Sequence, residues 1–150
     1  MSEKKPRVLR AIMTALLGLI IFAAVYFLSY LIIGGIINLL LKIPVIDKLL
    51  GWMFHLRGDT PDMMLSVLAP TIAYFVTMGV QESINKASST RGLSCMLIGI
   101  IIMVIHILSI VINLIYGDGI LKNIIQSIAG FIFFSSGKGE LRESKEDHHE

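Results

Sequence analysis

Three polar side chains lie at helical spacing inside an uncharged, apolar stretch of the chain. His106, Ser109 and Asn113 occupy positions i, i+3 and i+7 of the stretch 93–116, which contains no formal charge. This spacing places them on one face of a helix. Polar groups surrounded by lipid are costly, so they indicate either a functional site or hydrogen bonding between helices. His106 is the titratable group that this stretch would place near mid-membrane.

A second polar stripe is expected in the preceding apolar segment. Tyr74 and Thr77, together with Ser66 and Gln81, lie near one face of a helix over about 63–80. Two stripes that face each other would satisfy one another and form either a polar path or the wall of a small ligand pocket. The alternative is that they are interhelical hydrogen bonds, worth about 0.6 kcal/mol each, which need no ligand. The sequence favours the second interpretation and leaves the first open.

A further group of ionisable residues follows the first hydrophobic region. His55, Asp59 and Asp62 are spaced i, i+4 and i+7, and Asp118 lies in a later loop. A metal or catalytic cluster is conceivable, but a glycine and a proline interrupt any helix that would align the first three. Each aspartate also stands at an expected helix start, where a carboxylate caps N–H groups and meets the positive end of the helix dipole. We therefore expect capping here, with no metal, cofactor or catalytic residue.

The composition indicates an environment of lipid. Of 150 residues, 55% are hydrophobic and only 16% are charged, with a mean hydropathy of +0.78. The stretches 11–41 and 93–116 carry no charge at all, which is typical of membrane-spanning segments. The formal net charge of +2 is scattered over short loops, so no basic patch for nucleic acid is expected. Cys95 is the single cysteine, which excludes a disulfide within the chain.

These patterns predict an all-α integral membrane protein, a bundle of four transmembrane helices. Spans are expected at about 11–41, 63–80, 93–116 and 120–134, with an interfacial amphipathic helix at about 43–56 between the first and second spans and a polar central loop at 81–92. The first span would be roughly 45 Å long against a hydrocarbon layer of roughly 30 Å, so we expect a tilt or a bend at Gly34-Gly35. The last segment is short and polar enough to lie on the membrane surface instead. A basic tail precedes this single domain at 1–10, and a disordered tail follows it at 135–150.

Small residues also predict close helix packing. Thr14 and Gly18, and likewise Cys95 and Gly99, have the small-xxx-small spacing that lets helix backbones approach each other. The pattern indicates packing and nothing more specific.

The distribution of basic residues predicts the orientation. Four spans place nine lysines and arginines on one side and four on the other, and the richer side is expected in the cytoplasm. The nine are Lys4, Lys5, Arg7, Arg10, Lys86, Arg91, Lys138, Arg142 and Lys145. Both tails would therefore be cytoplasmic, whereas a surface-bound last segment would give six against seven. High isoleucine content and small size are compatible with a bacterial plasma membrane.

The leading functional hypothesis is a small non-enzymatic membrane protein that serves as an accessory, regulatory or structural subunit. It would act through its helix faces on other membrane proteins or on a second copy of itself, within the lipid bilayer. One alternative is an oligomeric transporter or channel subunit whose path is lined by His106, Ser109, Asn113, Tyr74 and Thr77. Another is a membrane enzyme centred on the outer His55, Asp59 and Asp62 group.

Overall fold

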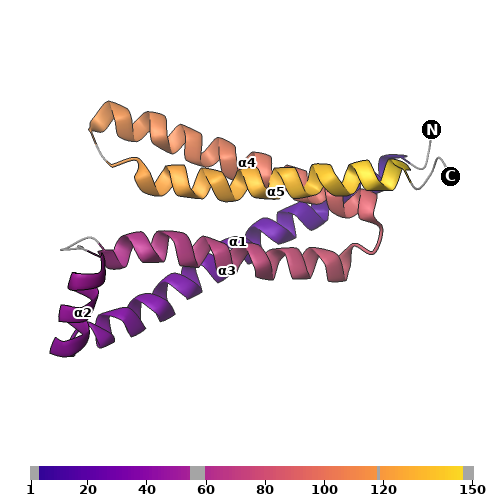
Figure 1. Cartoon of the computed structure of the whole chain (residues 1–150). Helices are drawn as coiled ribbons and strands as arrows, with labels where there is room; N and C mark the ends of the chain where they lie inside the picture. The colour runs from indigo at the N-terminus through magenta and orange to yellow at the C-terminus, as the bar shows by residue number, and fades with distance from the viewer. Residues whose placement is uncertain (1–3, 55–59, 118, 147–150) are drawn as a thin grey trace.

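The protein is built from five α-helices, with no strand among the residues that the structure describes. The computed structural model describes residues 4–54, 60–117 and 119–146. The helices are α1 (Lys4–Leu40), α2 (Pro44–Phe54), α3 (Thr60–Ile84), α4 (Ser88–Tyr116) and α5 (Leu121–Glu146). The chain runs up and down, so that α1 begins and α5 ends at the same end of the molecule, while α2 lies at the other end (Figure 1).

Three of these helices are long and apolar enough to cross a membrane. The qualifying segments are Arg7–Leu40, Met64–Ile84 and Ser88–Tyr116. The expectation of an all-helical membrane protein is confirmed at this level. Helix α5 is not among them, since polar residues such as Lys122, Asn123 and Gln126 interrupt its apolar first half and charged residues fill its second half. Helix α1 is one unbroken helix of 37 residues that continues through Gly34 and Gly35.

The connection between α3 and α4 is shorter than expected. A polar loop was expected at 81–92, but α3 continues to Ile84 and α4 begins at Ser88. Local polarity was misleading because polar side chains at the end of α3 are buried and hydrogen-bonded inside the bundle. The far end of α4 agrees with the prediction. Gly117 adopts a left-handed conformation (φ 74°) and donates its N–H to the Asn113 carbonyl, which ends the helix.

The expectation of a disordered C-terminal tail is wrong for residues 135–146, which continue α5 as helix. Residues 147–150 lie outside the described part of the chain. The tail folds because it has a tertiary partner. Arg91 Nε donates to both carboxylate oxygens of Glu140 at 2.8 Å, with side chains 21% and 19% exposed. Lysine, glutamate, arginine and leucine are also good helix formers, so only packing was needed to order this stretch.

We expect Glu140→Gln to loosen the end of α5, because it leaves the half-buried Arg91 guanidinium without its carboxylate partner. Tryptic cleavage after Lys138 and Arg142 should become on the order of fivefold faster, the change that about 1 kcal/mol of local opening produces. Glu146→Gln is the matched control, since its partner Arg142 and Glu146 itself are 83% and 69% exposed. Equal cleavage of both variants would show that the Arg91–Glu140 pair does not hold the helix in place.

The four long helices form two pairs. Helix α1 packs mainly on α3, and α4 packs mainly on α5. The pairs meet at the end where α1 begins and diverge toward the end that carries α2 (Figure 1). Ala15, Ile98, Ile102 and Phe133 form the buried apolar core where the pairs meet. The bundle is therefore closed at one end and splayed at the other.

Glycines bring α4 and α5 into backbone contact. A Cβ atom on Gly99 would lie 2.5 Å from the Gly130 carbonyl oxygen, and one on Gly92 would lie 2.7 Å from the Gly137 carbonyl oxygen. Gly99 lies seven residues after Gly92 on α4, and Gly130 lies seven residues before Gly137 on α5. The two helices run antiparallel, so these small residues meet in one row. We call this row the glycine seam. The close packing expected of Gly99 is thus confirmed, with α5 as its partner.

Candidate functional site

The polar stripe predicted on α4 faces α5. His106 Nδ1 lies 3.3 Å from Asn123 Oδ1 of α5. Asn113 Nδ2 donates to the carbonyl oxygen of Gly119 at 3.1 Å, and Ser109 Oγ donates to the Ile105 carbonyl oxygen of its own helix at 3.0 Å. None of the three therefore reaches α3 through its polar atoms.

The stripe predicted on α3 has different partners. The Tyr74 hydroxyl lies 2.9 Å from Ser136 Oγ of α5. Thr77 is fully buried, and its Oγ1 has no hydrogen-bond partner among the described residues. The hydrogen bond of Tyr74 therefore runs to α5 and not to the stripe on α4.

The glycine seam explains this outcome. His106 lies seven residues beyond Gly99 on α4, and Asn123 lies seven residues before Gly130 on α5. The two side chains thus continue the row in which Gly99 meets Gly130. The seam therefore brings α5 against this face of α4 at His106. His106 serves first as a contact between α4 and α5.

A double-mutant cycle on His106→Ala and Asn123→Ala should give a coupling energy of about 0.6 kcal/mol, the typical worth of one interhelical hydrogen bond in a membrane protein. The measurement is reversible unfolding in mixed micelles of mild detergent and dodecyl sulfate. Ser109→Ala paired with Asn123→Ala is the matched control and should show no coupling, since Ser109 bonds only within its own helix. Additive effects in the first cycle would contradict the pairing.

A cluster of buried polar residues joins three helices at the closed end. Gln81 of α3 is fully buried, and its Nε2 donates to the Thr14 carbonyl oxygen of α1 at 2.7 Å. Its Oε1 accepts from Ser94 Oγ of α4 at 2.8 Å and from Asn85 Nδ2 at 3.0 Å. Gly18 leaves the room for this amide, since a Cβ there would lie 2.6 Å from Gln81 Nε2.

Sequence reasoning found only part of this cluster. It placed Gln81 on the α3 stripe but assigned Asn85 to a loop and gave Ser94 no role. The available signal was the i, i+4 spacing of Gln81 and Asn85, directly after an apolar run. Asn85 is 1% exposed, and its Oδ1 has no hydrogen-bond partner within the described ranges.

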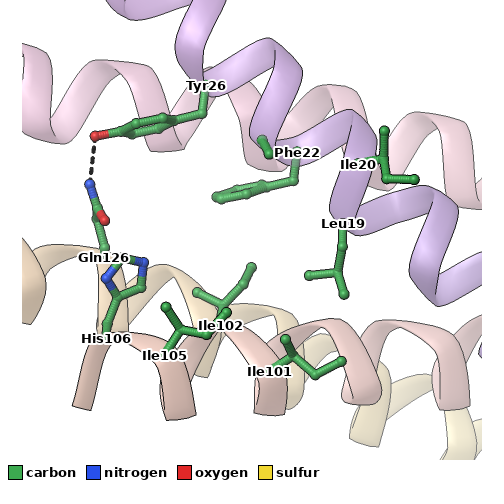
Figure 2. A pocket seen from close by; sticks show the side chains of 10 residues that line it. Leu19, Ile20, Phe22, Tyr26, Ile101, Ile102, Ile105, His106 and Gln126 are labelled. Carbon is green, nitrogen blue, oxygen red and sulfur yellow. Dashed lines mark hydrogen bonds between the residues drawn. The ribbon is translucent and has the colours of Figure 1, made fainter. Parts of the chain in front are cut away.

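Where the helix pairs diverge, a cleft of about 440 Å³ opens between α1 and α4. Its walls are apolar and include Leu19, Phe22, Ile101 and Ile105. Polar side chains gather at one end, where Tyr26, His106 and Gln126 line it (Figure 2). There Gln126 Nε2 donates to the Tyr26 hydroxyl oxygen at 2.6 Å, which links α5 to α1 across the opening. We call this space the α1/α4 cleft.

A second cleft of about 510 Å³ lies between α3 and α5. Tyr74, Phe75 and Ile128 are among its lining residues. Three aromatic rings stand between the two clefts. Phe133, which is fully buried, has its ring centroid 4.6 Å from that of Tyr74 and 5.6 Å from that of Phe22. We call this second space the α3/α5 cleft.

The outer group of ionisable residues cannot be placed as a site. His55, Asp59 and Asp118 lie outside the described residues, and of Asp62 only the helical backbone of α3 is described. Within the described ranges, no three histidine, cysteine, aspartate or glutamate side chains come together as they would around a metal ion. The capping role predicted for the aspartates stays a prediction.

Comparison of the chain with protein families, with curated proteins and with solved structures gives no match.

Proposed function

We propose that this chain is a four-span membrane protein that acts as a non-enzymatic accessory or structural subunit through its helix faces. The observation that carries the proposal is that polar side chains are hydrogen-bonded between the helices while large apolar side chains lie on the surface. His106 and Tyr74 are hydrogen-bonded to α5 inside the bundle. Large apolar side chains such as Leu28 and Ile115 are exposed along α1 and α4. The surface offered to the membrane is thus one for lipid and for other apolar helices.

The proposal includes a fourth span and two cytoplasmic tails in a bacterial plasma membrane. Helix α5 supports it by running antiparallel beside α4 and ending where α1 begins (Figure 1). The side that holds both ends of the helical bundle is also the side with nine of the thirteen lysines and arginines. In this arrangement α2 lies at the outer surface as the interfacial helix.

Cysteine labelling tests the topology. In a Cys95→Ser background, Gly119→Cys should react with a membrane-impermeant maleimide in intact cells, and Ser144→Cys should react only after the cells are opened. Cys95 is buried, so its replacement by serine removes the background thiol with little change in volume. Labelling of both positions in intact cells would rule out a spanning α5.

Photo-crosslinking in native membranes tests the function. A benzoylphenylalanine at Leu28, which is 58% exposed, should give a discrete adduct with another membrane protein or with a second copy of the chain. The matched control is the same residue at Leu17 of α1, which faces outward at 42% exposure but lies nearer the closed end. Adducts with lipid alone at both positions would remove the support for an accessory role.

One observation favours a second candidate, an oligomeric transporter or channel subunit. Thr77 and Gln81 of α3 and Asn85, which directly follows α3, are buried and spaced four residues apart. Thr77 Oγ1 and Asn85 Oδ1 have no hydrogen-bond partner in the part of the chain described, so they are available to a water or a solute. Ion flux in proteoliposomes that is lost in Thr77→Val would support this candidate, and the absence of flux would exclude it.

A further inference from the structure

We propose that the α1/α4 cleft binds a lipid-soluble molecule that has an apolar body and a single hydroxyl group. The cleft lies between two helices that are long and apolar enough to cross a membrane, so its occupant arrives through the hydrocarbon layer. Its volume of about 440 Å³ falls in the range of small-molecule sites, roughly 300–1,000 Å³. The apolar walls match the body of such a molecule.

The hydrogen bonds at the polar end determine which donors and acceptors the cleft presents to a ligand. The Tyr26 oxygen accepts from Gln126 Nε2 at 2.6 Å, and this bond does not use the hydrogen of the Tyr26 hydroxyl. His106 Nδ1 pairs with Asn123 Oδ1, a carbonyl oxygen that only accepts, so Nδ1 carries the ring hydrogen. In the neutral imidazole this leaves Nε2 as an acceptor. The cleft therefore presents one free donor and one free acceptor.

A hydroxyl group complements this pair better than other groups do. It can both accept a hydrogen bond, as Tyr26 requires, and donate one, as His106 Nε2 requires. A ketone or an ether accepts from Tyr26 but leaves His106 without a donor. An ammonium group donates only, and its charge is costly in a low-dielectric setting. The arrangement thus selects an alcohol.

The α3/α5 cleft provides a comparison for the α1/α4 cleft. There Thr71 Oγ1 donates to the Val67 carbonyl oxygen at 2.6 Å, and the Tyr74 hydroxyl is paired with the Ser136 hydroxyl at 2.9 Å. It has a similar size and similar apolar walls. It contains no histidine among its lining residues and serves as the internal control for the α1/α4 cleft.

The test compares two photoreactive probes on the unaltered protein in lipid nanodiscs. One probe is a diazirine-bearing hexadecanol, and the other is its methyl ether, which keeps the acceptor and lacks the donor. We expect the alcohol to half-saturate labelling of the peptides around Phe22 and Ile105 at an about tenfold lower concentration than the ether. Loss of one hydrogen bond to a group that is otherwise unpaired produces a change of that order.

Two matched variants locate the effect. Tyr26→Phe should raise the half-saturating concentration of the alcohol about tenfold and leave that of a hydrocarbon probe unchanged. Tyr74→Phe, the same substitution in the α3/α5 cleft, should change neither. Equal labelling by alcohol and ether in the unaltered protein would overturn the proposal whether or not either variant folds. So would an alcohol affinity that is the same in Tyr26→Phe.

Discussion

Replacement of Gly99 by alanine is expected to destabilise the protein by roughly 2 kcal/mol, although alanine is the better helix former by about 1 kcal/mol. The reason is the glycine seam. The new methyl group would lie 2.5 Å from both the Gly130 carbonyl oxygen and the Phe134 backbone nitrogen. Backbone atoms of a packed helix cannot swing aside as a side chain can, so α4 and α5 must separate. Reversible unfolding in dodecyl sulfate, followed by circular dichroism, measures the loss.

Gly79→Ala provides the matched control. Gly79 is also inside a helix, but a Cβ there meets no atom within 4 Å. Only the helix propensity changes, and a gain of up to about 1 kcal/mol is expected. The two identical substitutions should therefore have opposite signs. A stabilised or unchanged Gly99→Ala protein would mean that the seam is not closed in solution.

Gln81→Met is expected to cost about 2 to 3 kcal/mol. The substitution keeps the length of the side chain and removes an amide that hydrogen-bonds to Thr14, Ser94 and Asn85. Three interhelical or intrahelical bonds at about 0.6 kcal/mol each account for most of this value, and the buried partners left without a bond account for the rest. The same unfolding measurement applies, and α1 should be the first helix to detach.

Gln126→Met is the matched control, because it makes the same substitution at a glutamine with fewer hydrogen bonds. It removes one hydrogen bond, to Tyr26, at a half-buried position, so a loss of about 0.6 kcal/mol is expected. Equal effects of the two glutamine variants would show that Gln81 does not hold α1, α3 and α4 together. A large effect of Gln126→Met alone would place the main link between the helix pairs at the splayed end.

The glycine seam and the Gln81 cluster give the bundle an uneven stability. The Gln81 cluster lies at the closed end and the glycine seam lies along the α4–α5 pair, while the Tyr26–Gln126 hydrogen bond crosses the α1/α4 cleft. We expect motion of the two helix pairs relative to each other to be concentrated at the splayed end. A ligand in the cleft would stabilise the protein by adding contacts where the fold has the fewest.

The sequence by itself determined the helical class and the segments fit to span a membrane. An uncharged apolar stretch as long as 93–116 is typical of a membrane-spanning segment. In lipid its backbone N–H and C=O groups must be hydrogen-bonded within the segment, which requires a helix. The end of α4 at Gly117 was likewise a local property, because a left-handed residue favours glycine. Such features depend on neighbours along the chain.

Only the tertiary structure decided which faces meet. The seven-residue spacing of Gly92 and Gly99 is visible in the sequence, but that it matches Gly130 and Gly137 depends on the antiparallel register of α4 and α5. That register turned His106 toward Asn123 and ordered a tail whose composition suggested disorder. These outcomes arise from contacts between residues far apart in the chain, and composition and periodicity carry no information about such contacts.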